Sequence, residues 1–88
     1  MKVQVTLTVE PQPQLRDPEA EAVTVALADL GFDNVEAMHV GKIYRWTEET
    51  PSLALAEQRA EEMARRILAN PVSEHFTVEV HPYLEAAS

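Results

Sequence analysis

The sequence of 88 residues contains no cysteine, which excludes disulfide bonds and zinc–thiolate sites. It contains only two glycines, so Gly31 and Gly41 should mark places where the backbone needs a positive φ or a close approach. It also lacks a long apolar run. The first ten residues alternate polar and apolar side chains, which excludes the apolar core of a signal peptide. We therefore expect a cytoplasmic protein without a membrane-spanning segment.

Basic residues are few as well. Seven Lys and Arg stand against fifteen Asp and Glu, which gives a net charge of −8. Binding to nucleic acid or to an anionic membrane needs a basic face, so this charge argues against both partners. A chain of this size forms one domain and buries only roughly 60–65% of its unfolded surface. We therefore expect additional burial, through a homo-oligomer or a partner protein.

The order of the sequence patterns predicts an α+β fold. Residues 3–9 alternate as a half-buried strand, and residues 76–80 alternate again near the end of the chain. Between them, Asp17-Pro18 and Thr50-Pro51 are each typical of a helix start, with a capping side chain followed by proline. The predicted architecture is a two-layer sandwich of ferredoxin-like type, in which a mostly antiparallel sheet carries two helices on one face.

The ends of the helices are also predicted. Gly31 fits the left-handed position that closes the first helix. Asn70 fits the same position after the second helix, and Pro71 prevents that helix from continuing. Apolar residues recur every three or four positions along the second helix and predict its buried stripe. They are Leu53, Ala56, Ala60, Met63, Ala64, Ile67 and Leu68.

Residues 34–48 are rich in strand formers but alternate poorly. Two structures fit them: Gly41-Lys42 forms a tight turn between antiparallel strands, or it forms a bulge in one bent strand. Poor alternation is typical of a strand covered on both faces, by helices on one side and by another subunit on the other. Tyr44 and Trp46 are therefore candidates for self-association, because aromatic residues are enriched in interfaces.

No set of residues indicates an active site or a metal site. His75 and His81 lie on one strand about 20 Å apart, so they cannot share an ion within one chain. Glu79 and His81 could supply only two ligands. We therefore predict no catalytic, metal-binding or cofactor-binding residue in this chain. Lys42, which follows Gly41, is a candidate for contact with a partner.

Several motifs resemble those of the PurS subunits of phosphoribosylformylglycinamidine (FGAM) synthase. The family pattern has an Asp-Pro helix start, a Leu-Gly-Phe/Tyr helix end, a Gly-Lys segment and a late Leu-Ala-Asn-Pro-Val-x-Glu. These motifs fall here on Asp17-Pro18, Leu30-Gly31-Phe32, Gly41-Lys42 and residues 68–74. The resemblance covers nearly the whole chain. It departs at His39, where the family usually has arginine.

The resemblance implies a single PurS-like domain over residues 1–88 that does no chemistry itself. Such a subunit joins the glutaminase subunit (PurQ-like) to the large synthetase subunit (PurL-like), as a homodimer or homotetramer. Ammonia from glutamine then serves the ATP-dependent conversion of formylglycinamide ribonucleotide (FGAR) to FGAM in purine biosynthesis. ATP and magnesium belong to the larger subunit, and this chain carries no cofactor.

On this resemblance, His39, Lys42, Asn70 and Glu74 are the candidates for contacts with the larger subunits. An alternative from another class is a small dimeric regulatory module of ACT or ferredoxin-like type, which binds a small molecule at its dimer interface.

Overall fold

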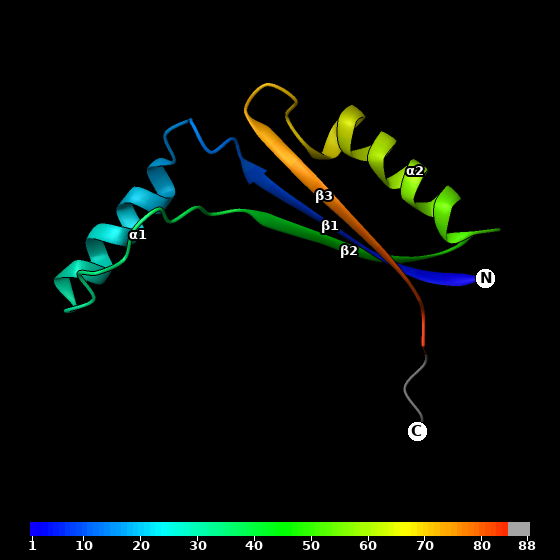
Figure 1. Cartoon of the computed structure of the whole chain (residues 1–88), viewed down its shortest axis with the longest axis horizontal. Coiled ribbons are helices and arrows are strands. Elements are labelled where there is room, and N and C mark those ends of the chain that lie inside the picture. Colours follow the sequence, from blue (N-terminus) through cyan, green and yellow to red (C-terminus); the bar gives the residue numbers. More distant parts are fainter. Residues whose placement is uncertain (85–88) are drawn as a thin grey trace.

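The computed structural model describes residues 1–84, in which helices and strands alternate (Figure 1). The elements in order are β1 (Lys2–Pro11), α1 (Pro18–Asp29), β2 (Lys42–Glu49), α2 (Leu53–Met63), a π-helical turn (Ala64–Leu68) and β3 (Glu74–Pro82). The predicted α+β class is confirmed. Within the described residues, no helix has the length and apolar character needed to cross a membrane.

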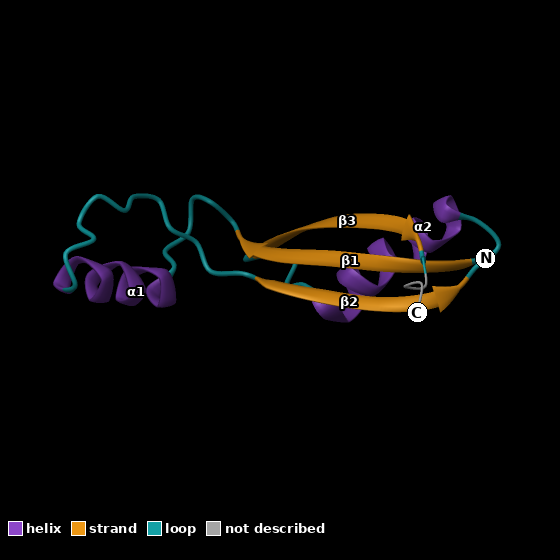
Figure 2. Cartoon of the chain, turned by 90° about the horizontal axis from the view of Figure 1, so that it is seen from below, coloured by secondary structure: helices purple, strands orange, loops and turns teal. Residues whose placement is uncertain are grey.

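The three strands form an antiparallel sheet in the order β2-β1-β3, so the first strand of the chain lies at the centre (Figure 2). In the register, Val5 lies opposite Trp46 on one side and Val80 on the other. The alternation predicted for β1 is confirmed. One face of the strand is completely buried, and it consists of Val3, Val5, Leu7 and Val9.

The helix α2 covers this apolar face. Two alanines of α2, Ala56 and Ala60, and Ala64 of the π-helical turn are buried, and they pack against the valines and leucine of β1. Their small side chains bring the helix close to the sheet. The core is therefore thin: its largest fully buried side chains are one leucine and three valines of β1. Among residues 1–84, no helix lies on the opposite face of the sheet (Figure 2).

The end of α2 departs from a regular α-helix. The π-helical turn changes the direction in which the last side chains point. Leu68 packs on the core, whereas Ile67 is 80% exposed, so the predicted burial of both residues is wrong for Ile67. The predicted left-handed end at Asn70 is also wrong. The chain leaves the helix at Ala69 in an extended conformation, with φ −129° and ψ 145°.

The start of α2 also differs from the predicted one. Its N-cap is Ser52, whose hydroxyl accepts a hydrogen bond from the backbone N–H of Leu55 at 3.1 Å. Thr50 is buried instead, and its hydroxyl donates to the carbonyl of Ser52 at 3.0 Å. Thr50 therefore holds the turn before the helix rather than capping it.

The helix α1 stands away from the sheet, beyond the end of β1 (Figures 1 and 2). The prediction that two helices cover one face is therefore wrong in this respect, because only α2 packs there. The radius of gyration is 16.9 Å, whereas a compact chain of this length has about 12 Å. Within its own chain, α1 packs on the loop that follows it.

The two glycines have the two roles expected of them. Gly31 has φ +95° and closes α1: its N–H donates to Ala28, and the next N–H, of Phe32, donates to Leu27. Gly41 lies against β1, where an added Cβ would stand 2.5 Å from the carbonyl oxygen of Val9. Neither predicted form of Gly41-Lys42 is found. Residues 34–41 are a loop that returns from α1, and β2 begins at Lys42.

Candidate functional site

Partner-contact candidates from two segments, residues 39–42 and 70–74, lie at one end of the sheet, which we call the loop end. There β1 ends at Pro11, while β2 begins at Lys42 and β3 begins at Glu74. In the register, Val9 faces Lys42 and Pro11 faces Glu74. Lys42 and Glu74 are thus on the two outer strands, on the order of 10 Å apart across the sheet. Asn70 and His39 lie in the loops that enter these strands.

Asn70 and Glu74 hold each other in a closed turn. The backbone N–H of Asn70 donates to Oε1 of Glu74, and the N–H of Glu74 donates to the carbonyl of Asn70, each at 2.8 Å. The amide oxygen of Asn70 accepts from Val72 at 2.9 Å and from Ser73 at 3.3 Å. Both side chains therefore shape the turn from residue 70 to residue 74.

Gln12 joins this turn to the end of β1. Its backbone N–H donates to the carbonyl of Ser73 at 2.9 Å, and its side chain donates to the carbonyl of Glu74 at 3.2 Å. Two segments that are far apart in the sequence are thereby held together at the loop end. A partner would meet a preformed surface there, with Lys42 exposed at its side.

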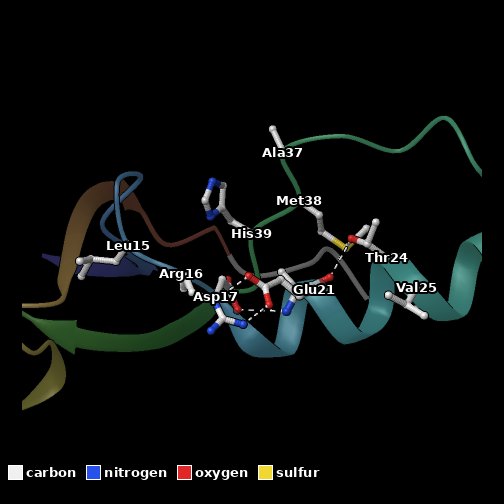
Figure 3. Close-up of a pocket in the computed structure, with 10 residues that line it drawn as sticks. Leu15, Arg16, Asp17, Glu21, Thr24, Val25, Ala37, Met38 and His39 are labelled. Carbon is white, nitrogen blue, oxygen red and sulfur yellow. Dashed lines mark hydrogen bonds and ion pairs between the residues drawn. The ribbon is translucent and has the colours of Figure 1, made fainter.

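Asp17 fixes the direction in which α1 leaves the sheet (Figure 3). One carboxylate oxygen caps α1 by accepting from Ala20 at 3.0 Å, as predicted from the Asp-Pro start. The other accepts from the backbone N–H of Val40 at 2.9 Å, in the returning loop. The bond from Val40, followed by that from Ala20, lowers the pKa of Asp17 below its ordinary value. Asp17 thus joins the start of α1 to the end of the loop that returns from α1 to the sheet.

Arg16 and Glu21 form a second link beside this clamp. The guanidinium donates two hydrogen bonds to the carboxylate, at 3.1 and 2.6 Å. These bonds lower the pKa of Glu21 and raise that of Arg16. The pair is exposed, so its effect on stability is small.

An open groove of about 430 Å³ lies between α1 and the returning loop (Figure 3). Met38 reaches across it toward Thr24, whose hydroxyl lies 3.9 Å from the sulfur. Ala37 adopts φ +53°, which is uncommon for a residue with a side chain. His39 lines the groove and is exposed. The groove therefore presents one imidazole beside the Asp17 carboxylate.

Tyr44 and Trp46, the predicted self-association residues, follow Lys42 on β2. They share the face of the sheet that α2 covers, and they are half-buried against the core of their own chain. Trp46 packs beside both core clusters. The structure therefore places both aromatics against the core of their own chain, whereas Lys42, on the same strand, is exposed.

The loop end presents the exposed Lys42 and the turn closed by Asn70 and Glu74. Among residues 1–84, no three His, Cys, Asp or Glu side chains are grouped in a way that could hold a metal ion. Sequence reasoning found the capping role of Asp17 but missed its bond to Val40. That partner lies 23 residues away in the chain, and nothing in the local sequence marks it.

Comparison with known proteins identifies the family. The family model PurS, described as phosphoribosylformylglycinamidine (FGAM) synthase, matches residues 4–82. The chain belongs to the PurS family. Its relatives include the FGAM synthase subunit PurS of Synechocystis, which is 35% identical over 79 residues, or 90% of this chain and 75% of the relative. The corresponding subunit of Archaeoglobus fulgidus is 36% identical over 70 residues, which cover 80% of this chain and 88% of the relative.

Solved PurS structures have the same fold. Thermus thermophilus PurS matches with a TM-score of 0.81 and 34% identity, covering 96% of this chain and 100% of that one. A chain in the structure of PurLQS from Thermotoga maritima matches with a TM-score of 0.83 and 21% identity, covering 92% and 99%. The second likeness shows the shared fold alone.

The four PurS motifs lie in two places in the fold, at the two ends of α1 and at the loop end. Asp17-Pro18 and Leu30-Gly31-Phe32 mark the start and the end of α1. Gly41-Lys42 and residues 68–74 lie together at the loop end, although they are far apart in the sequence. Two of the PurS motifs thus build one surface.

Proposed function

We propose that this chain is the non-catalytic assembly subunit of FGAM synthase. It joins the glutaminase subunit (PurQ-like) to the large synthetase subunit (PurL-like), so that ammonia released from glutamine is used to convert FGAR to FGAM. ATP and magnesium bind the larger subunit in this proposal, and the complex works in the cytoplasm. The PurS match over residues 4–82 is the observation that carries it.

The surface at the loop end supports this role. It is preformed by the Asn70–Glu74 turn and by Gln12, and it presents the exposed Lys42 beside that turn. Preformed surfaces lose little conformational entropy on binding. We propose that His39, Lys42, Asn70 and Glu74 contact the larger subunits there. His39 stands where an arginine is usual in PurS, so this contact is a neutral hydrogen bond unless the imidazole is protonated.

The family match also favours this function over the alternative regulatory module of ACT type. A thermal-shift screen with amino acids and nucleotides separates the two, because a tight ligand raises the melting temperature of the free protein. We expect no such shift for the isolated chain. A large shift with one amino acid would support the regulatory module instead.

The central experiment compares the two nitrogen donors. FGAM formation is measured with the large subunit and the glutaminase, with and without this chain, using glutamine and then ammonium. We expect glutamine-dependent turnover to require this chain and ammonium-dependent turnover to proceed without it. If neither rate changes and no complex forms on a sizing column, the assembly role is wrong.

The variant Lys42→Ala tests the loop end within the same assay. Rim charges affect association most, so we expect about a tenfold weaker binding of the larger subunits, with unchanged ammonium-dependent turnover. Lys2→Ala is the matched control, because Lys2 lies on the same sheet at the opposite end. Equal behaviour of the two variants would remove Lys42 from the contact surface.

A further inference from the structure

A turn over residues 70–74 joins the helical segment 53–68 to β3 (Figure 1), and it exposes an apolar side chain. Val72, in the middle of this turn, is 84% exposed. Valine favours strands, whereas turns favour polar residues and glycine. Scattered apolar residues are normal on a protein surface, so the exposure of Val72 is informative only together with its surroundings.

The first of these surroundings is the rigidity of the turn. The amide oxygen of Asn70 accepts from the backbone N–H of Val72 itself at 2.9 Å and from that of Ser73 at 3.3 Å. Two further bonds, each of 2.8 Å, close the turn between Asn70 and Glu74. The polar groups of the turn are thus bonded to one another, and the apolar side chain of Val72 is held outward. A side chain held in this way loses little conformational entropy on binding.

The second is a hollow beside the turn. An open cavity of about 390 Å³ lies between the π-helical turn and the start of β3, and Pro71 and Glu74 line it. Its other lining residues are Ala64, Arg65, Ala69, His75 and Phe76. The guanidinium of Arg65 lies 5.9 Å from the centre of the Phe76 ring and is paired with Glu61 of its own chain at 3.3 Å. The surface therefore combines a projecting Val72 with a largely apolar hollow.

The third is the charge at the loop end. The arginines of the helical segment 53–68 are each paired with a glutamate of their own chain. Lys42 is exposed, and no ion pair joins it to any carboxylate of residues 1–84. In a chain with a net charge of −8, Lys42 thus presents a positive charge to a partner. A carboxylate is the group that complements it.

We propose that Val72 is the apolar anchor of the loop end. Its partner is the larger subunit that meets this end of the sheet, through an apolar socket for Val72 and a carboxylate that faces Lys42. The inference rests on the assembly role proposed above and extends it to a residue outside the four candidates. Asn70 and Glu74 act in this contact as positioning residues, because the bonds that they make inside the turn hold Val72 in place.

Truncation of Val72 tests the anchor. This chain is titrated into a mixture of the large subunit and the glutaminase, and glutamine-dependent FGAM formation is measured. For Val72→Ala we expect the half-saturating concentration of this chain to rise at least about tenfold, with an unchanged rate at saturation. Val72→Ile keeps the apolar side chain and should saturate near the parent. Leu84→Ala is the matched control, because Leu84 is 85% exposed and lies beyond the opposite end of the sheet.

Variants of Asn70 test the positioning role. Asn70→Ala removes the oxygen that accepts from Val72 and Ser73, whereas Asn70→Asp keeps an acceptor there. We expect Asn70→Ala to raise the half-saturating concentration and Asn70→Asp to restore it. The double variant with Val72→Ala should bind no more weakly than Val72→Ala alone, because both changes remove the same contact. Additive effects would show that Asn70 contacts the partner directly and would overturn its positioning role.

The outcomes separate this inference from the proposed function. A parent chain without effect on glutamine-dependent turnover would overturn the assembly role and the anchor together. A parent chain that acts, with a Val72→Ala variant that saturates like it, would leave the assembly role standing and overturn the anchor. Equal weakening by Leu84→Ala would also overturn the anchor, since the loss would then follow from apolar surface at either end of the sheet. Urea unfolding of each variant checks that its fold is retained.

Discussion

At the scale of single residues, two positions determine how α1 is attached to the sheet. Asp17 joins the start of the helix to the returning loop, and Gly41 lets that loop pass close to the carbonyl of Val9. One of these contacts is electrostatic and the other is steric. The contact of Asp17 therefore responds to pH, whereas that of Gly41 responds to the size of the side chain.

Replacing Gly41 with alanine should destabilise the chain. The added methyl group would stand 2.5 Å from the carbonyl oxygen of Val9, so β1 and the loop must move apart. We expect a loss of about 1–3 kcal/mol in the free energy of unfolding, measured with urea. Gly31→Ala is a useful comparison, because its added Cβ meets nothing within 4 Å and acts only through the positive φ. A Gly41→Ala variant as stable as the parent would contradict the close approach.

Asp17 makes stability depend on pH. Its pKa is lowered in the folded chain, first by the N–H of Val40 and then by that of Ala20. The stabilisation is therefore fully present above the ordinary value of 3.8 and is lost as the pH falls through the lower folded pKa. We expect Asp17→Asn to be less stable than the parent at neutral pH and to approach it in acid. Urea unfolding across this pH range measures the difference. Asp29→Asn, which changes a carboxyl at the other end of α1, should not reproduce this convergence.

At the scale of elements, the sequence predicts a helix or strand well where residues next to one another in the chain determine it. The alternation of β1, the Asp17 cap and the Gly31 end of α1 are all decided by neighbouring residues, and all are confirmed. Residues 34–41 contain strand formers but form a loop, because their partner is α1 rather than another strand. The outward turn of Ile67 was not predictable, since a π-helical turn leaves no signal in the apolar spacing.

The candidate site shows the same limit. The Gly-Lys motif and the residues from 68 to 74 were recognised separately, but their meeting at the loop end depends on the register of β1 with β2 and β3. The separation of α1 from the sheet could not be predicted either. The apolar residues of a helix indicate that it is buried, but they do not show which surface buries it.

The cap of α2 gives a prediction at this scale. Because Ser52 accepts from the N–H of Leu55, Ser52→Ala should lower the free energy of unfolding by about 1 kcal/mol. Ser52→Asp keeps an acceptor at the same place and should retain most of the stability. Thermal and urea unfolding report both. If the alanine and aspartate variants are equally destabilised, the cap at Ser52 is not the cause.

At the scale of the whole molecule, the small core is the main constraint. A single leucine and three valines of β1 are the largest side chains that are fully buried, and α2 contributes only alanines to that buried set. A domain of this size has little stability to lose. This is consistent with a chain that works inside an assembly.

The variant Leu7→Ala should therefore lose much of its free energy of unfolding. Leu7 is fully buried at the centre of the sheet, and its truncation should cost about 2–5 kcal/mol. That is a large part of the roughly 5–15 kcal/mol that stabilises a typical domain. Urea unfolding at one fixed protein concentration measures the loss, because association adds to the apparent stability. Val72→Ala, at an exposed position, should change stability by no more than about 0.5 kcal/mol.

The place of β1 at the centre of the sheet has a consequence during synthesis. The ribosome makes this strand before β2 and β3, which are its two neighbours in the sheet, and Val3 pairs with Pro82, 79 residues later. The nascent chain therefore carries an apolar strand that stays unpaired on one edge until β3 has emerged. Contacts between such distant segments slow folding. The core of this small subunit therefore closes only after β3 has been synthesised, and until then the unpaired edge of β1 is exposed to aggregation.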